Sequence, residues 1–292
     1  MTNAKQQIDA TPARIEALRK SAQAHKYSHG HALILSGGPG RTGAARLAAR
    51  GALRIGAGLV TLGVPGAAQM EVASYVTAVM LRRAGTADEL TTVLEDARIN
   101  ALCLGPGLGM SDERASLLEV ALKSGRSLVL DADALTLISR DAALFAMVHE
   151  GCVLTPHGGE FARLFPDIAE KLNAPAKTGP AYSKADATRA AAARIGGVVL
   201  FKGADTVIAA PDGRCCINSA ADERAAPWLA TAGSGDVLAG FIAGLLARGL
   251  GPMQAAEMAA WLHVECARSF GPGLIAEDLP EELPKVFRTL GV

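Results

Sequence analysis

Short apolar runs alternate with longer amphipathic stretches along most of the chain, and this alternation restricts the fold more than any other feature of the sequence. The apolar runs have the length of buried strands, and the stretches between them have the length of helices. Such an alternation predicts an α/β fold with a mainly parallel central sheet and helices on both faces. The runs expected to form strands are residues 31–36, 58–62, 77–81, 101–104, 127–130, 152–154, 198–201, 206–209 and 215–217.

The first 25 residues differ in character from the rest of the chain. Residues 1–25 are polar and are expected to form an N-terminal extension, with a helical pattern from Thr11-Pro12 to about Ala24. Residues 26–292 contain no linker, low-complexity tract or internal repeat, so we expect them to form one domain. The longer helices are expected at residues 43–55, 111–123, 181–195, 235–248 and 252–270, with a short helix after Asp278.

The balance of charge limits the classes of partner, and the cysteine pattern indicates the redox compartment. Lys and Arg together number 29, as do Asp and Glu, so the net charge is zero. A neutral chain favours neither nucleic acid nor an anionic membrane surface as a partner. The five cysteines form no C-x-x-C pair, which is typical of free thiols in a reducing compartment. No apolar run approaches the roughly 18 residues of a membrane span, and we therefore expect a cytoplasmic protein.

The segment Ala230–Gly240, with the sequence ATAGSGDVLAG, carries the strongest chemical signal. Gly233 and Gly235 allow backbone N–H groups to approach an anion closely, and the helix that follows adds the partial positive charge of its N-terminus. An aspartate inside such a loop, here Asp236, is electrostatically unfavourable unless it removes a proton from a hydroxyl group that attacks a bound phosphorus. The alternative is an ordinary helix start in which the glycines only form the turn.

This segment resembles the signature of the ribokinase-like superfamily, and the chain is similar, within it, to the ADP/ATP-dependent NAD(P)H-hydrate dehydratases. The resemblance extends over about residues 26–287. The chain differs from that family at Gly158, where proline is usual, at Ser234, where threonine is frequent, and over residues 219–229. The further matching segments are Gly37–Gly58, Gly105–Gly109, Asp131–Leu135, Thr155–Glu160 and Lys202–Thr206.

The resemblance implies a ribokinase-like fold and a reaction. The reaction is the nucleotide-dependent dehydration of hydrated NADH and NADPH, named (S)-NADHX and NADPHX, to NADH and NADPH, with release of AMP or ADP and phosphate. ADP or ATP would be the co-substrate and Mg²⁺ the cofactor. The resemblance also implies a homo-oligomer, commonly a tetramer, and a functional link to an NAD(P)H-hydrate epimerase.

The same resemblance implies roles for single residues. Asp236 would be the catalytic base and would also contact the substrate. Glu160 would hold Mg²⁺ through water. The other substrate contacts would be Ala44, Gly107 and His157, and the nucleotide would be bound by Lys202, Gly203, Ala204, Asp205, Thr206, Gly233, Ser234 and Gly235.

Several of these residues also have a purely structural interpretation. Lys202–Thr206 could be a turn between two strands, and His157 could be a strand-end histidine that bonds to the backbone. Glu160 could be a carboxylate favoured by a helix N-terminus. Asp133 is expected to cap a helix, whereas Asp131 is expected to face the site. Structural roles are expected for His31, His149 and His263.

Two rival functions stay open at this point. A kinase of a small alcohol, such as a thiazole or pyrimidine precursor of thiamine, would use the same aspartate and anion-binding loop. A nucleotide sensor without catalysis would keep the loop alone, but the intact Gly233–Asp236 argues against it. The segments Ala57–Thr61 and Thr155–Glu160 favour the dehydratase over the kinase.

Overall fold

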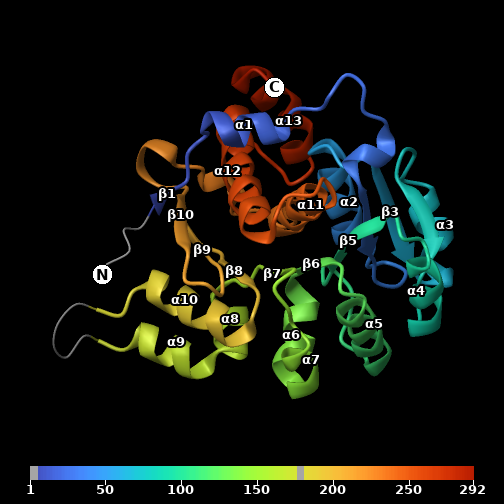
Figure 1. Ribbon diagram of the computed structural model, residues 1–292, viewed down its shortest axis with the longest axis horizontal. Helices are drawn as coiled ribbons and strands as arrows, with labels where there is room; N and C mark the ends of the chain where they lie inside the picture. The colour runs from blue at the N-terminus through green and yellow to red at the C-terminus, as the bar shows by residue number, and fades with distance from the viewer. Residues whose placement is uncertain (1–5, 176–180) are drawn as a thin grey trace.

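The computed structural model describes residues 6–175 and 181–292. Its centre is a ten-stranded sheet with the strand order β1-β10-β9-β8-β7-β6-β5-β2-β3-β4 (Figure 1). Among these strands, β9 is antiparallel to both neighbours and all other adjacent strands are parallel, which confirms the predicted mainly parallel sheet. The strands are β1 (Gln6–Gln7), β2 (His31–Leu35), β3 (Leu59–Val64), β4 (Met80–Arg83), β5 (Ile99–Leu104), β6 (Ser127–Leu130), β7 (Cys152–Leu154), β8 (Val198–Phe201), β9 (Asp205–Ala209) and β10 (Cys215–Ser219).

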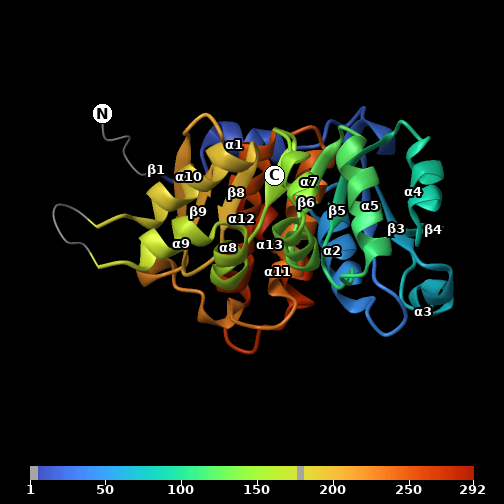
Figure 2. The ribbon, with the colours of Figure 1, turned by 90° about the horizontal axis from the view of Figure 1, so that it is seen from below.

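Helices cover both faces of the sheet, as the alternation predicts (Figures 1 and 2). One layer consists of α1 (Pro12–Leu18), α2 (Gly43–Arg54), α11 (Ser234–Ala247), α12 (Pro252–Phe270) and α13 (Asp278–Leu290), with the short α3 (Gln69–Ala73) near the edge. The other layer consists of α4 (Ala87–Leu94), α5 (Asp112–Lys123), α6 (Ala132–Arg140), α7 (Ala142–Ala146), α8 (Gly158–Leu164), α9 (Pro166–Asn173) and α10 (Lys184–Ile195).

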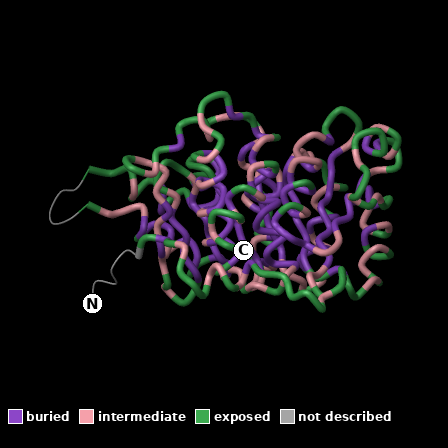
Figure 3. Tube along the Cα trace, turned by 90° about the horizontal axis from the view of Figure 1, so that it is seen from above, coloured by how far each residue is buried: buried purple, intermediate pink, exposed green. Residues whose placement is uncertain are grey.

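The strands are buried on both faces because both helical layers pack on them (Figure 3). In β2, Ala32 and Ile34 belong to the core under α2 and α11, whereas Leu33 and Leu35 belong to the core under the opposite layer. This follows from the period of two along a strand, which directs successive side chains to opposite faces. Strands of this kind have no polar face, so they appear in the sequence as continuous apolar runs.

Helix α11 lies in unusually close contact with α2. A Cβ atom added at Gly240 would lie 2.1 Å from the carbonyl oxygen of Ala48, and one added at Gly244 would lie 2.6 Å from that of Ala52. The two backbones therefore touch where the glycines lack side chains. Every residue of α11 from Val237 to Ala247 is buried, so the helix is held on all sides by the core.

Some elements differ from the sequence-based expectation. The strand expected at residues 77–81 begins only at Met80, and the first helix ends at Leu18 because Arg19 has an extended backbone. The helix after Asp278 is longer than expected. It continues through Pro284, and its buried side chains Leu279 and Leu283 lie on one face, which the core holds in place.

Both edges of the sheet are short strands. At one edge, β1 pairs in parallel with β10, and the next residue, Ile8, is only 1% exposed. Residues 6–18 thus pack on the domain, and the boundary after residue 25 stays a prediction. At the other edge, β4 exposes Arg82 and Arg83. No helix within residues 6–175 and 181–292 is long and apolar enough to cross a membrane.

The contact between α2 and α11 leads to a test. Replacing Gly240 with alanine would force a methyl group against the backbone of α2, and overpacking of this kind costs about 1–3 kcal/mol. We expect a lower free energy of unfolding in a denaturant titration. The matched control is Gly251→Ala, whose methyl group meets open space and should change stability by less than about 1 kcal/mol. Equal stability of the two variants would contradict the close contact.

Candidate functional site

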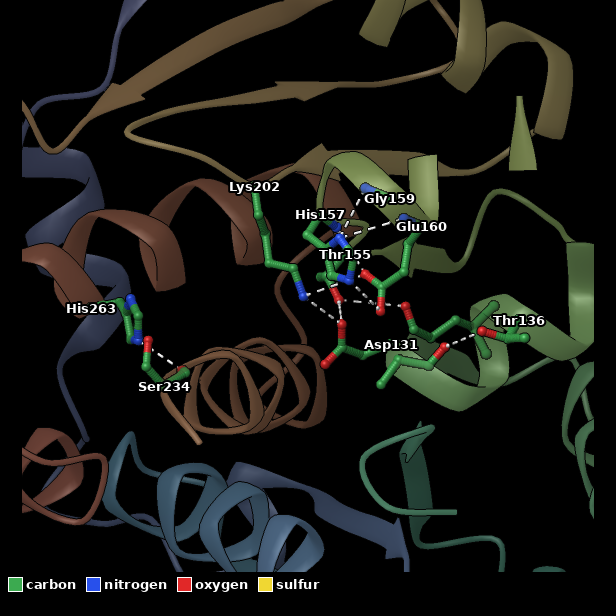
Figure 4. Close-up of polar contacts among 11 residues, drawn as sticks. Asp131, Thr136, Thr155, His157, Gly159, Glu160, Lys202, Ser234 and His263 are labelled. Carbon is green, nitrogen blue, oxygen red and sulfur yellow. Dashed lines mark hydrogen bonds and ion pairs between the residues drawn. The ribbon is translucent and has the colours of Figure 1, made fainter. Parts of the chain in front are cut away.

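The polar groups expected to carry the chemistry gather at the carboxyl ends of the parallel strands. Segments that follow β6, β7 and β8 meet there with the N-terminus of α11 (Figure 4). This is the usual ligand position in open α/β sheets. A cavity of about 640 Å³ opens beside these segments.

The loop before α11 has the geometry of an anion-binding site. Gly233 has a φ of +87°, and a Cβ atom there would lie 2.7 Å from Leu47 Cδ1, so only glycine fits. The first turn of α11 follows directly, and within the described residues the N–H groups of Gly235 and Asp236 have no backbone acceptor. A Cβ atom at Gly235 would lie 3.6 Å from Lys202 Nζ. Open N–H groups, a helix N-terminus and an ammonium group therefore lie together.

Lys202 forms the centre of a charged cluster. Its Nζ donates to Asp131 Oδ1 at 2.8 Å and lies 3.8 Å from Glu160 Oε2. The hydroxyl of Thr155 donates to the same oxygen of Asp131 at 2.7 Å. Asp131 is 2% exposed, and burying a carboxylate without such hydrogen-bonded partners is energetically costly.

Asp236 lies close enough to this cluster for the charges of Asp131 and Lys202 to change the pKa of its carboxyl group. Burial raises the pKa of its carboxyl group, the negative charge of Asp131 raises it further, and the positive charge of Lys202 lowers it, with a resulting pKa of about 6. Burial and a like charge both disfavour the ionised form. A carboxyl group with such a pKa is suited to accept a proton from a substrate near neutral pH.

His157 and Glu160 form a reciprocal cap at the start of α8. His157 Nδ1 accepts from the N–H groups of Gly159 and Glu160 at 3.0 and 3.4 Å, and Glu160 Oε2 accepts from the N–H of His157 at 2.8 Å. His157 therefore bonds to the backbone at the end of a strand, and Glu160 lies at a helix N-terminus, as their structural interpretations require. Because Nδ1 accepts, the N–H of a neutral His157 ring lies at Nε2, which is 3.4 Å from Glu160 Oε1.

The carboxylates permit only one kind of magnesium site. Within residues 6–175 and 181–292, no group of three or more His, Cys, Asp and Glu side chains could hold a metal ion. Asp131 and Glu160 instead flank the ammonium group of Lys202. Mg²⁺ usually keeps several waters and binds one or two carboxylates together with substrate phosphates. These two carboxylates fit an ion that is held mainly by phosphates and reached through water, but not an ion enclosed by the protein alone.

The segment Lys202–Thr206 forms the turn between β8 and β9 and the first two residues of β9, and a lysine of α10 holds it. Lys184 Nζ donates to the carbonyl oxygens of Lys202 at 3.0 Å and Asp205 at 2.7 Å. A Cβ atom at Gly203 would lie 2.6 Å from this ammonium group. Burial lowers the pKa of Lys184 to about 8. Nothing in the local sequence indicates this contact, because Lys184 lies outside every matching motif.

The structure brings most of the predicted site residues together. Ala44 and Gly107 lie outside the cavity but close to each other, since a Cβ atom at Gly107 would lie 3.6 Å from that of Ala44. Asp205, Gly233, Asp236 and Glu160 adjoin residues that line the cavity. The predicted residues that line it directly are His157, Lys202, Gly203, Ala204, Thr206, Ser234 and Gly235.

One expectation about a neighbouring residue needs correction. Asp133 is not the helix cap, because Asp131 occupies that position and Asp133 instead accepts from the N–H of Gly109 at 2.8 Å. His263, for which a structural role was expected, lines the cavity, and its Nε2 donates to the carbonyl of Ser234 at 2.9 Å. Burial lowers the pKa of His263 to about 4, so the ring is a neutral donor that anchors the start of α11.

Comparison with known proteins agrees with this geometry. A model of the family described as NAD(P)H-hydrate dehydratase matches residues 32–286. The bifunctional NAD(P)H-hydrate repair enzyme Nnr of Moorella thermoacetica is 38% identical over 97% of this chain and 54% of its own. The enzyme of the same name from Coxiella burnetii is 32% identical over 89% of this chain and 51% of its own. The chain thus spans about half the length of the curated relatives it matches.

Solved structures show the same fold. The ADP/ATP-dependent NAD(P)H-hydrate dehydratase of Bacillus subtilis, co-crystallised with ATP/Mg²⁺, is 26% identical, with a TM-score of 0.77 over 99% of this chain and 100% of its own. A ribokinase-like superfamily protein of Enterococcus faecalis is 22% identical, with a TM-score of 0.79 over 96% of this chain and 95% of its own. The fold is therefore ribokinase-like, and the match over residues 32–286 shows that the chain belongs to the NAD(P)H-hydrate dehydratase family.

Proposed function

We propose that this chain uses ADP or ATP to dehydrate NADHX and NADPHX to NADH and NADPH. The observation that carries the proposal is Asp236, a carboxyl group with a pKa of about 6 at the open N-terminus of α11 and close to Lys202. This arrangement combines a proton acceptor with groups that bind phosphate. The names of the curated relatives, NAD(P)H-hydrate repair enzymes, and of the Bacillus subtilis dehydratase support this choice of substrate.

The proposed chemistry converts a poor leaving group into a good one. Asp236 takes the proton of the hydroxyl group on the hydrated nicotinamide ring, and the freed oxygen forms a bond to the terminal phosphorus of the nucleotide. The bond from that phosphorus to the bridging oxygen breaks and releases AMP from ADP, or ADP from ATP. The lone pair of the ring nitrogen then expels phosphate from the ring carbon, and loss of a ring proton restores the reduced nicotinamide.

The surrounding residues bind and orient the two substrates in this proposal. The N–H groups of Gly235 and Asp236 and the ammonium of Lys202 would receive the charge that develops on the transferred phosphoryl group. Ala44, Gly107 and the Nε2–H of His157 would contact the hydrated dinucleotide. Mg²⁺, held by the phosphates and through water by Glu160 and Asp131, would supply further positive charge when bound. The remaining proposed nucleotide contacts are Gly203, Ala204, Asp205, Thr206, Gly233 and Ser234.

We also propose the wider setting of the reaction. The curated relatives are bifunctional, and the chain matches about half of each, which supports a functional link to an NAD(P)H-hydrate epimerase. A homo-oligomer is proposed on the family resemblance alone. The alternative function, a kinase of a small alcohol, has no observation in its favour beyond the shared fold, which a hydroxyethylthiazole kinase of Pyrococcus horikoshii also has at 15% identity and a TM-score of 0.64.

The proposed function is tested by measuring the products of the reaction. The protein is incubated with hydrated NADH, Mg²⁺ and either ADP or ATP, and absorbance of the reduced nicotinamide is recorded together with released phosphate. We expect both to appear in equal amounts and only when a nucleotide is present. A stable phosphorylated alcohol in place of NADH would indicate a kinase. Full-rate dehydration with EDTA and without nucleotide would exclude the proposed route.

Asp236→Asn tests the proposed base. The amide keeps the shape of the side chain but cannot accept the proton, and loss of positioned proton transfer lowers turnover roughly 10²–10⁴-fold. Nucleotide affinity should hold or improve, since a negative charge near the phosphates is removed. A thermal melt should show a variant at least as stable as the wild type, because burial disfavours the charged aspartate. Near-normal turnover in this folded variant would exclude Asp236 as the base.

The raised pKa of Asp236 determines a pH profile. The base must be unprotonated, so kcat/KM should be level above about pH 6 and fall tenfold per pH unit below it. Asp131→Asn removes a negative charge that raises this pKa, and the acidic limb should therefore move to lower pH. The measurement is a pH series of kcat/KM for both proteins. An acidic limb that stays in place in Asp131→Asn would contradict the coupling.

A further inference from the structure

Lys184 has an unusual position beside the segment Lys202–Thr206. It is the first residue of α10, where the partial positive charge of the helix N-terminus disfavours a cation. Burial disfavours its charged form as well. The ammonium group is stabilised by the ring of Phe201, whose centroid lies 4.3 Å away, and by the carbonyl groups of Lys202 and Asp205, to which it donates. Its contacts with this segment therefore account for its place in the fold.

Every carbonyl group from residue 202 to residue 205 is hydrogen-bonded. Besides the two that accept from Lys184, the carbonyl of Gly203 accepts from the hydroxyl of Thr206 at 3.0 Å, and that of Ala204 accepts from the N–H of Ala220 at 2.8 Å. By contrast, the N–H groups of Gly203 and Ala204 have no backbone acceptor within residues 6–175 and 181–292. The segment thus offers open donors, while its acceptors are occupied.

The geometry of the peptide bond connects the contact of Lys184 with these open donors. In a trans peptide the C=O group and the next N–H group point in opposite directions, and no peptide bond among the described residues is cis. Because the C=O of Lys202 is directed at Lys184, the N–H of Gly203 is directed away from it. Gly203 and Ala204 line the cavity of the candidate site, and Lys184 does not. Neighbouring N–H groups in a turn of this kind bind anions.

The elements on either side of this contact are fixed. At the start of α10, the hydroxyl of Ser183 accepts from the N–H of Asp186 at 3.2 Å, and the carboxylate of Asp186 accepts from the N–H of Ser183 at 3.1 Å. The N–H of Lys202 donates to the carbonyl of Pro156 at 2.9 Å. The contact with Lys184 therefore determines the orientation of the peptide that follows Lys202. Without it, this peptide would be free to turn its carbonyl oxygen toward the cavity, where it would repel a phosphate group.

We propose that Lys184 is a positioning residue for the nucleotide. It holds the carbonyl groups of Lys202 and Asp205 on the outer side of the segment, so that the N–H groups of Gly203 and Ala204 stay open to a phosphate group. This inference rests on the proposed function, which puts ADP or ATP in the cavity of the candidate site. Lys184 itself touches neither the nucleotide nor the reacting atoms.

The test compares two ligands that differ only in the phosphates, ADP and adenosine. Their dissociation constants are measured by calorimetry in the presence of Mg²⁺, together with a thermal melt of each protein. We expect Lys184→Met to weaken ADP about tenfold, the worth of a hydrogen bond to a charged group, and to leave adenosine within about twofold. A merely structural lysine would lower the melting temperature and leave the affinity for ADP unchanged.

Lys171→Met is the matched control. The ammonium of Lys171 also lies over an aromatic ring, that of Tyr182 at 4.3 Å from the centroid, but it belongs to α9 and takes no part in the hydrogen bonds of the segment. Its replacement should change neither dissociation constant. If Lys184→Met does not fold, Lys184→Gln, which keeps an N–H donor without the charge, is expected to weaken ADP selectively in its place.

The remaining outcomes separate the positioning role from the proposed function. Unchanged affinity for ADP in a folded Lys184→Met, or equal weakening of ADP and adenosine, would overturn the role of Lys184. The dehydration assay is run separately on the wild type. Dehydration without the selective loss of ADP affinity in the variant would reject the role of Lys184 alone, whereas the selective loss without dehydration would reject the function alone.

Discussion

The contact between the backbones of α2 and α11 positions the helix start that carries the anion-binding loop and Asp236. Gly240 and Gly244 let the two helices touch, and this contact orients the N-terminus of α11 toward the ends of the central strands. Gly233 extends the same contact, because only a missing side chain leaves room for Leu47. The anion-binding loop is therefore a product of helix packing as much as of its own sequence.

The charged cluster lies beside the N-terminus of α11, which the contact with α2 positions. Asp131, Glu160 and Asp236 approach one another in a buried region, and Lys202 is the cation that neutralises part of their charge. Burial raises the pKa of Asp236, and the negative charge of Asp131 raises it further because one ammonium group does not balance three carboxylates. A proton acceptor near neutral pH thus results first from the burial of Asp236 and then from an incomplete balance of charge, which a bound phosphate and its accompanying cation would alter.

Sequence patterns predicted the parts of this structure that are local. The apolar runs located most of the strands, because strands buried on both faces leave a continuous signal, and the glycine-rich segment located the start of α11. Lys184 contacts Lys202, and Arg46 contacts the ring of Tyr75. In each case the two residues are far apart in the chain, so no local pattern describes the contact. The strand β1, described at Gln6–Gln7, has no apolar run of its own, and its pairing with β10 depends on residues that are distant in the chain.

The edges of the sheet have a consequence for how copies of the chain can associate. A strand with open N–H and C=O groups can join the edge of a neighbouring molecule and extend the sheet across both. Within the described residues, one edge ends in β1, and the other ends in β4, where Arg82 and Arg83 would meet the same charges on a second copy. Intermolecular strand pairing is therefore disfavoured at the β4 edge, which protects this edge of the sheet from aggregation and directs association of copies to other surfaces.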